Sequence, residues 1–371
     1  MTPILVVGAG HIGQAIAALL QGTGDYQVTL ADRAAEALAA CRVPGVATLA
    51  LDVADRAALD AALKGKWAVM SAAPYHLTVK IAEAARAAGV NYLDLTEDVA
   101  STKRVMALSE GAPTVMIPQC GLAPGFISIV AADLAARFES LHDLRLRVGA
   151  LPKYPSNALN YNLTWSTDGV INEYCEPCEA LVDGELRQTR ALEECETFAL
   201  DGVTYEAFNT SGGLGTLCES LAGRVRNLNY RTIRYPGHAA IMKALLNDLR
   251  LRERRHILKD ILENALPATM QDVVIVFVTA SGLRDGVLVQ ETYAHRVYSG
   301  TIGGAPASAI QITTAGAACA VLDMLHAGAL PARGFVRQEE IALADFLANR
   351  FGRVYAMAGD SDRAEPRMAA E

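Results

Sequence analysis

A glycine-rich turn near the start of the chain has the spacing needed to bind the phosphates of a dinucleotide. Gly8, Gly10 and Gly13 follow the apolar residues 4–7 and precede an apolar-periodic segment, so the G-x-G-x-x-G fingerprint has its required strand-turn-helix context. Gly8 permits the tight turn, Gly10 lets the backbone approach the pyrophosphate, and Gly13 lets the helix pack on the strand. The cofactor contacts expected from this turn also include those of His11 and Ile12.

An acidic residue about twenty positions further on supports this interpretation. Asp32 ends the next apolar stretch. A carboxylate there accepts hydrogen bonds from the ribose hydroxyls and repels a 2′-phosphate, which predicts NAD rather than NADP. Arg33 leaves the other cofactor possible, because an arginine beside the ribose can accommodate a 2′-phosphate. We interpret Arg33 as lying over the adenine face.

Further cofactor contacts are expected at the ends of the next two strands. Asp52 and Val53 follow the strand expected at 47–51 and are placed to contact the adenine, although Asp52 could also cap the following helix. The segment Ala72-Ala73-Pro74 follows the strand expected at 67–71. Its small residues would let the nicotinamide half of the dinucleotide pass close to the backbone.

Polar side chains suited to acid-base chemistry follow the same predicted strands. Tyr75, Asp94 and Glu97 stand just after strand ends, as does Gly121. Ligands of a doubly wound sheet bind outside the carboxyl ends of its strands, so these residues are expected to line a cleft. The alternative for each of them is a helix cap or a turn.

The first third of the chain alternates apolar strand candidates with amphipathic helices. This order predicts an α/β fold with a Rossmann-type, doubly wound parallel sheet. The second part changes to a period of two, with residues 159–165 alternating and Asp-Gly turns at 183–184, 201–202 and 285–286. A helical stretch is expected over 238–266. Together these features predict a second α+β domain with a mixed or antiparallel sheet.

We therefore divide the chain into four parts. Residues 1–124 form the dinucleotide-binding domain, residues 125–302 the domain for substrate binding and oligomerisation, residues 303–350 the C-terminal helices, and residues 358–371 a frayed tail.

Composition excludes several classes of function. The net charge of −8 argues against nucleic acid as a partner, and the apolar runs are too short to predict a membrane span. Seven scattered cysteines do not form a disulfide framework. Cys175 and Cys178 lack the second pair that a zinc site needs, so no metal is expected. With no signal peptide pattern at the start, these features predict a cytoplasmic enzyme.

Several motifs occur in an order that resembles the saccharopine dehydrogenase family. Besides the glycine turn, they are residues 71–75 (SAAPY), 92–97 (YLDLTE), 121–125 (GLAPG), 210–213 (TSGG) and 232–238 (TIRYPGH). Within the family, the chain is most similar to lysine 6-dehydrogenase in three stretches, which are 121–125 (GLAPG), 172–174 (NEY) and 233–238 (IRYPGH). That enzyme oxidises the terminal amine of L-lysine with release of ammonia. The resemblance implies NAD use, a homodimer or homotetramer, and a return of the C-terminal helix to the first domain.

An amino-acid substrate implies roles for particular residues. Arg234 is the residue expected to hold the substrate carboxylate, because its planar fork of donors suits one, and a structural ion pair is the alternative. Hydride can leave only from the neutral amine, which is scarce at neutral pH, so a base is useful. The candidates for that base, which we do not rank, are His238, Asp94, Glu97 and Tyr75. Further substrate contacts are expected from Gly121, Leu122 and Asn162.

Two other functions remain open. A saccharopine or carboxynorspermidine dehydrogenase would form its imine between two substrates, and a non-catalytic sensor would bind NAD without turnover.

Overall fold

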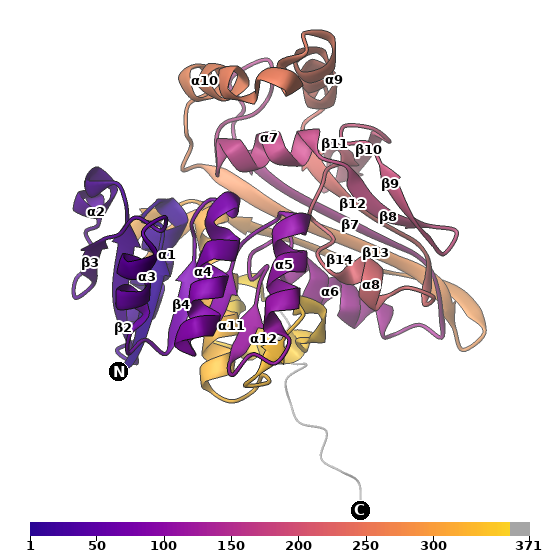
Figure 1. Cartoon of the computed structure of the whole chain (residues 1–371). Coiled ribbons are helices and arrows are strands. Elements are labelled where there is room, and N and C mark those ends of the chain that lie inside the picture. Colours follow the sequence, from indigo (N-terminus) through magenta and orange to yellow (C-terminus); the bar gives the residue numbers. More distant parts are fainter. Residues whose placement is uncertain (357–371) are drawn as a thin grey trace, which may run out of the picture.

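The computed structural model describes residues 1–356, so the tail predicted for 358–371 lies outside the described residues. Figure 1 shows a sheet flanked by helices at the N-terminal end, and a second, larger sheet beside it with α7, α9 and α10 above one end. The predicted α/β class, with a Rossmann-type domain followed by a mixed-sheet domain, is confirmed.

The first sheet has the order β17-β6-β5-β4-β1-β2-β3, and all of its strand pairs are parallel. The chain reverses its direction of progress between β1 and β4, which is where a ligand cleft opens in this architecture. The elements are β1 (Thr2–Val7), α1 (His11–Gln21), β2 (Tyr26–Asp32), α2 (Ala35–Ala40), β3 (Ala47–Ala50), α3 (Arg56–Leu63), β4 (Ala68–Ser71), α4 (Tyr75–Ala88), β5 (Asn91–Asp94), α5 (Val99–Ser109), β6 (Val115–Ile117) and, from the far end of the chain, β17 (Gly334–Phe335).

The second sheet has the order β10-β11-β12-β7-β13-β14, with β8 pairing β12 and β9. It is mixed, because β12 and β7 run parallel while its other pairs are antiparallel. Its strands are β7 (Ser140–Pro152), β8 (Cys178–Val182), β9 (Glu185–Thr189), β10 (Glu196–Leu200), β11 (Val203–Asn209), β12 (Val225–Arg234), β13 (Asp272–Arg284) and β14 (Val287–Tyr298), and a small hairpin of β15 (Gly300–Ile302) and β16 (Ala305–Ala307) follows.

The three Asp-Gly turns are confirmed as hairpin turns. In the turn between β13 and β14, Asp285 has a φ of 52° and Gly286 a φ of 74°, and the other two turns have positive φ at both positions as well. Asp and Gly tolerate this left-handed backbone, which matches the twist of the flanking strands.

Two expectations for the second domain are wrong. Residues 159–165 alternate in polarity but form an irregular segment, because the Asn157 amide donates to the Tyr161 carbonyl (2.6 Å) and Asn160 turns the chain with a φ of 49°. The stretch 238–266 is not one helix. It breaks at Arg250, which has a φ of 57°, into a first part of α9 (His238–Lys243) with the π-helical turn η1 (Ala244–Asp248), and a second part of the 3-10 helix η2 (Leu251–Arg254) with α10 (Arg255–Ala265).

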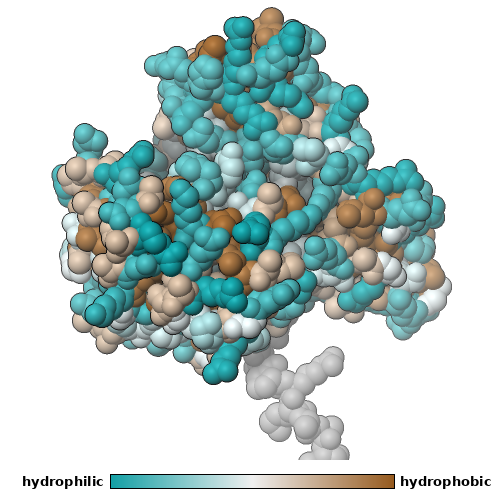
Figure 2. All heavy atoms as spheres, in the orientation of Figure 1, coloured by the Kyte–Doolittle hydropathy of each residue, from teal (hydrophilic) through white to brown (hydrophobic). Residues whose placement is uncertain are grey.

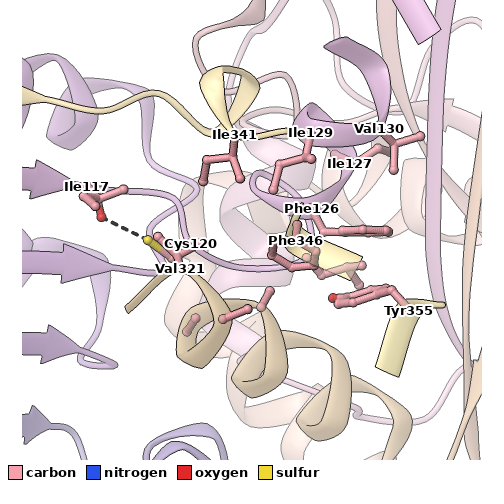
Figure 3. Close-up of a cluster of buried hydrophobic side chains, with 14 of the residues drawn as sticks. Ile117, Cys120, Phe126, Ile127, Ile129, Val130, Val321, Ile341, Phe346 and Tyr355 are labelled. Carbon is pink, nitrogen blue, oxygen red and sulfur yellow. Dashed lines mark hydrogen bonds between the residues drawn. The ribbon is translucent and has the colours of Figure 1, made fainter. Parts of the chain in front are cut away.

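A layer of helices packs between the two sheets. α6 (Phe126–Ala135) and α11 (Ala309–His326) both contact β13, and α11 also packs on α1. Figure 3 shows the aromatic centre of this layer, where Phe126 stacks on Tyr355 with ring centroids 3.8 Å apart and Phe346 lies beside them. The remaining elements are α7 (Thr167–Cys175), α8 (Leu217–Ser220), η3 (Gln338–Glu340), α12 (Leu343–Ala348) and η4 (Gly352–Tyr355). One hydrophobic core therefore extends across both domains and holds their relative placement.

α11 is long and apolar enough to cross a membrane, yet 72% of it is buried inside the protein. It is a core helix, which explains its composition. The face of the molecule in Figure 2 is mainly hydrophilic, and hydrophobic spheres lie over the first domain as well as at the free end of the second sheet. The exposed apolar side chains include Leu186, Val287 and Leu288, which lie at or beside hairpin turns of that sheet.

Candidate active site

A cavity of about 420 Å³ lies where the carboxyl ends of the first sheet meet the second domain. The first domain lines it with residues of four loops, each of which follows a strand. The second domain lines it with residues of β7, β12 and α7. Among the predicted site residues, those that line the cavity are Gly8, Gly10, Ile12, Asp32, Ala72, Ala73, Pro74, Tyr75, Glu97, Gly121, Leu122 and Arg234.

The glycine turn is shaped by packing at two positions and left open at the third. A Cβ on Gly8 would lie 2.5 Å from the Ala72 carbonyl oxygen, and one on Gly13 would lie 1.8 Å from the Gly8 carbonyl oxygen. A Cβ on Gly10 would meet no protein atom within 4 Å, although this residue lines the cavity. No side chain caps α1 at Gly10. The free space beside an uncapped helix N-terminus fits a pyrophosphate group.

Asp32 is fixed at the edge of the cavity by backbone donors. One carboxylate oxygen accepts from the Ala9 N–H (2.6 Å) and the other from the Ala34 N–H (2.8 Å). Each carboxylate oxygen can accept more than one hydrogen bond, so both remain able to accept from ribose hydroxyls. The cradle of Gly10 and the carboxylate of Asp32 therefore suit a nicotinamide dinucleotide.

Five predicted cofactor residues do not line this cavity. Gly13 supports the turn from behind, and His11 and Arg33 are exposed beside it. Asp52 is exposed and accepts from the Ala54 N–H (2.9 Å) in a local turn, whereas Val53 is buried in the core. The cap of α3 is Asp55, whose carboxylate accepts from the Ala58 N–H. The adenine contacts predicted for Asp52 and Val53 stay predictions.

Asp94 is a structural carboxylate in this fold. It is 1% exposed and accepts hydrogen bonds from the Tyr92 hydroxyl (2.8 Å) and from the backbone N–H groups of Thr96 and Gln119 (2.9 Å each). Burial raises the pKa of Asp94 to about 6, against the lowering effect of these donors. Because it does not line the cavity, Asp94 acts on the site by fixing the loops that follow β5 and β6.

Besides Asp32 and Asp168, two carboxyl groups whose pKa is raised face the cavity from different domains. Glu97 comes from the loop after β5, and Glu173 comes from α7. Burial raises the pKa of Glu97 to about 7 and that of Glu173 to about 8, and Glu97 adds to the second effect by charge repulsion. Ionisation of both groups is costly in an empty cavity, so a bound cation would stabilise their charged forms.

Arg234 brings the positive charge to the same cavity. Its guanidinium is 2% exposed and lies over the Tyr161 ring, with 4.9 Å from Cζ to the ring centroid. Its Nε donates to the Tyr174 hydroxyl (2.9 Å), and Nη1 donates to Thr232 Oγ1 and to the Ile233 carbonyl.

The ion-pair alternative for Arg234 is not observed. Within residues 1–356 no carboxylate lies at ion-pair distance from its guanidinium, and the hydrogen bonds of this part of the chain leave Nη2 unused. A buried guanidinium with an unused edge at a cavity is suited to bind an anion.

His238 and Asn162 lie behind the cavity wall. His238 is 1% exposed and sits between the Tyr174 hydroxyl and the Leu159 carbonyl. Asn162 is buried and its amide donates to the Pro267 carbonyl (3.2 Å). Neither residue lines the cavity, so the substrate contact predicted for Asn162 and the role as a base considered for His238 stay predictions.

Sequence reasoning overlooked Glu173. This residue stands in the NEY stretch, but its neighbours gave no pattern that distinguishes a cavity-facing glutamate from a helical surface one. α7 is buried along nearly its whole length, which is what makes a glutamate in it unusual. Thr232, Tyr230 and Trp165 also line the cavity and were likewise not predicted as site residues.

No metal centre is formed among residues 1–356, where no group of three or more His, Cys, Asp or Glu could hold an ion. Cys175 and Cys178 are free and buried, and burial raises the pKa of both thiols.

A glycine cradle, a ribose-binding carboxylate and a polar second domain that meet in one cavity define a two-domain oxidoreductase that uses a nicotinamide dinucleotide. Residues 4–116 match the saccharopine dehydrogenase NADP binding domain, and residues 121–354 match the saccharopine dehydrogenase C-terminal domain. The chain therefore belongs to the saccharopine dehydrogenase family.

One solved structure supports this fold. The chain is similar to the apo saccharopine dehydrogenase (L-Glu forming) of Saccharomyces cerevisiae, with 17% identity, a TM-score of 0.74, and coverage of 91% of this chain and 94% of that chain. It is also similar to the DAP dehydrogenase of C. glutamicum in complex with DAP, with 13% identity, a TM-score of 0.49, and coverage of 92% and 94%. At these identities the likeness concerns the fold alone.

Proposed function

We propose that the chain catalyses the NAD-dependent oxidative deamination of the terminal amine of L-lysine, or of a similar diamino acid. The observation that carries this proposal is the set of charges facing the substrate half of the cavity, where Arg234 stands with Glu97 and Glu173. L-lysine carries one carboxylate and two ammonium groups, so each of its charges has a partner of opposite sign.

The same charges favour lysine over saccharopine. Saccharopine carries three carboxylates, whereas Arg234 is the one cationic side chain among the described residues that line the cavity. Two carboxylates of saccharopine would then be left without a cation beside two protein carboxyl groups, an arrangement that like-charge repulsion disfavours. A condensing reaction with a dicarboxylate keto acid meets the same difficulty.

The residues divide the work between the two ends of the substrate. Arg234 would hold the carboxylate with its unused Nη2 edge, and Glu173, on the neighbouring α7, would pair with the α-ammonium. Glu97 stands on the loop after β5, whose neighbour β4 ends in the Ala72-Ala73-Pro74 segment. This neighbourhood supports Glu97 as the group that would take a proton from the terminal ammonium beside the expected position of the nicotinamide.

The cofactor, when bound, accepts a hydride from the carbon attached to the terminal nitrogen. Once Glu97 has taken one proton from the terminal ammonium, departure of the hydride would remove two electrons and leave an iminium ion. Addition of water to the iminium would then give the semialdehyde and release ammonium. Gly10 and Asp32 bind the dinucleotide, and the Asp32 carboxylate disfavours a 2′-phosphate, so NAD is the proposed form. We further propose a cytoplasmic homodimer or homotetramer.

The test is the appearance of NADH absorbance with purified protein, NAD and a panel of L-lysine, L-ornithine, 1,5-diaminopentane and saccharopine at alkaline pH. Turnover with L-lysine and little with saccharopine is expected. Turnover with saccharopine alone, or only in the reductive direction with a keto acid, would replace the proposal by the condensing reaction. NADH binding without turnover of any amine would indicate a sensor.

A further inference from the structure

Three consecutive hydrogen bonds connect the cavity to a backbone carbonyl of the second domain that lies behind the cavity wall. Arg234 Nε donates to the Tyr174 hydroxyl (2.9 Å), the Tyr174 hydroxyl bonds His238 Nε2 (3.1 Å), and His238 Nδ1 bonds the Leu159 carbonyl oxygen (2.9 Å). Only Arg234 lines the cavity, so the other members of this chain of bonds lie behind its wall.

The donor and the acceptor of each of these three hydrogen bonds follow from the chemistry of the groups. A carbonyl oxygen can only accept, so His238 Nδ1 carries a hydrogen and donates to Leu159. A guanidinium can only donate, so the Tyr174 oxygen accepts from Arg234. The Tyr174 hydrogen is then free to point at His238 Nε2, which must be the unprotonated nitrogen. The neutral Nδ1–H tautomer is the form of His238 that satisfies all three bonds.

The surroundings oppose a second proton on this imidazole. His238 packs among the rings of Tyr161, Tyr174 and Phe208. Burial, followed by the charge of Arg234, lowers the pKa of His238 to about 3, although the bond to Leu159 acts in the opposite direction. An imidazolium would also turn an N–H toward a hydroxyl oxygen that already accepts from Arg234.

The backbone around His238 is held independently of the cavity. The Glu206 carboxylate, on β11, accepts from the Gly237 N–H (2.9 Å) and from the Ala239 N–H (2.7 Å), on either side of the histidine. Glu206 also lies directly opposite Arg234 in the register of β11 and β12. A single residue of β11 therefore contacts both the end of β12 and the start of α9.

We propose that His238 is a positioning residue, which acts through Tyr174 to fix the guanidinium of Arg234 so that its Nη2 edge faces the substrate carboxylate. This inference rests on the proposed function, in which Arg234 binds that carboxylate. This role differs from that of the general base, for which His238 was one of four unranked candidates, because the imidazole does not line the cavity and its accepting nitrogen already bonds the Tyr174 hydroxyl.

The test compares variants that keep or remove the hydrogen bond between the Tyr174 hydroxyl and its acceptor at His238 Nε2. Tyr174→Phe and His238→Leu remove one link each, and KM for L-lysine should rise about ten- to hundredfold with the larger part of the loss in KM rather than kcat. His238→Gln keeps an acceptor oxygen near the place of Nε2 and should recover most of the affinity. The matched control is Tyr355→Phe, which removes a buried hydroxyl bond to the Thr313 carbonyl, and neither of these two residues lines the cavity.

A substrate without a carboxylate shows whether the variants disturb the position of Arg234 or the structure of the protein in general. With 1,5-diaminopentane the Tyr174→Phe and His238→Leu variants should match the wild type, because no carboxylate is present to be held. In an Arg234→Ala background the two substitutions should add nothing for L-lysine. Equal losses with both amines, or a large fall in kcat with the alkaline limb of the pH profile removed, would overturn the proposal in favour of a base or of a role in folding alone.

A measurement that does not depend on turnover keeps the proposal testable if the variants do not fold or if the wild type does not oxidise lysine. Imidazole ¹⁵N NMR of the wild-type chain, with His238 assigned by its absence in His238→Gln, should show the Nδ1–H tautomer unchanged between about pH 5 and 9. An Nε2–H tautomer, or titration in that range, would overturn the positioning chain. Absence of lysine oxidation with the Nδ1–H tautomer intact would instead reject the proposed function.

Discussion

Glu97 and Glu173 are held at one cavity by a single loop. The Ser211 N–H donates to the Glu173 carbonyl (3.1 Å), and the next residue, Gly212, comes so close to Glu97 that a Cβ would lie 2.3 Å from the Glu97 carbonyl oxygen. The TSGG loop thus fixes the backbones of two carboxylates that belong to different domains. Burial raises the pKa of both groups into the range near neutrality. Repulsion by Glu97 adds to this effect at Glu173, and repulsion by Asp98 and Asp94 adds to it at Glu97.

The first prediction concerns stability in the absence of ligand. The pKa of Glu173 is raised by folding, to about 8, so between its ordinary value and about 8 the native state binds more protons than the unfolded state. Stability then decreases as pH rises through this range. Glu173→Gln cannot ionise, and it should be more stable than the wild type by roughly 1–3 kcal/mol at about pH 8.5, with little difference at about pH 5.

Thermal melts of both proteins at the two pH values measure this difference. Glu185→Gln is the control, because the Glu185 side chain is 74% exposed and the substitution removes no buried carboxylate. A Glu173→Gln variant that is less stable than the wild type at both pH values would mean that the carboxylate makes a stabilising bond instead.

The second prediction concerns the proton acceptor. Glu97→Gln should lower kcat for amine oxidation by roughly 10²–10⁴-fold and leave NADH affinity unchanged. Since the pKa of Glu97 is raised to about 7, wild-type activity should rise with pH through that value, and the variant should lose this limb of the profile. Activity of Glu97→Gln within a factor of two of the wild type would assign the proton to another group.

The third prediction compares two glycines of the same turn. Gly10→Ala meets no protein atom, so the variant should fold with an unchanged melting temperature and lose dinucleotide binding by at least about tenfold. Gly13→Ala would place a Cβ 1.8 Å from the Gly8 carbonyl oxygen and should be destabilised. NADH fluorescence titration and thermal melts distinguish the two effects. Normal NADH binding by Gly10→Ala would mean that the pyrophosphate does not bind beside Gly10.

The fourth prediction concerns the choice of cofactor. Asp32→Ala removes the carboxylate that disfavours a 2′-phosphate, so KM for NAD should rise by about ten- to hundredfold while use of NADP improves relative to NAD. Arg33→Ala in the same background should reverse the improvement with NADP, if Arg33 then receives the phosphate. Steady-state kinetics with both cofactors measures this effect. An unchanged ratio of kcat/KM for NAD to kcat/KM for NADP would show that Asp32 does not select between the two cofactors.

The fifth prediction concerns the substrate carboxylate. Arg234→Lys keeps the charge but removes the Nε donor to Tyr174 and the planar Nη2 edge, so KM for L-lysine should rise by about tenfold or more. Arg145→Lys, at a largely exposed arginine, is the matched control. Unchanged affinity of Arg234→Lys for L-lysine would refute the assignment of the carboxylate to Arg234.

The local sequence determined the parts of this protein that depend on neighbours along the chain. The glycine turn, the ends of β2 and β4, and the three Asp-Gly hairpins were predictable because backbone sterics and alternation act within a few residues. Two segments were predicted wrongly for a related reason. Residues 159–165 alternate like a strand but are turned by Asn157 and Asn160, and the helix expected over 238–266 is broken at Arg250.

The tertiary structure decided which polar residues face the cavity. Asp94 and Glu97 are three positions apart, yet backbone donors and Tyr92 take up Asp94 while Glu97 reaches the cavity. Glu173 is brought to the site by α7, and His238 is withdrawn from it by Tyr174 and Leu159. Acid-base roles depend on burial and on partners far apart in the chain, and these are set only when the two sheets pack together.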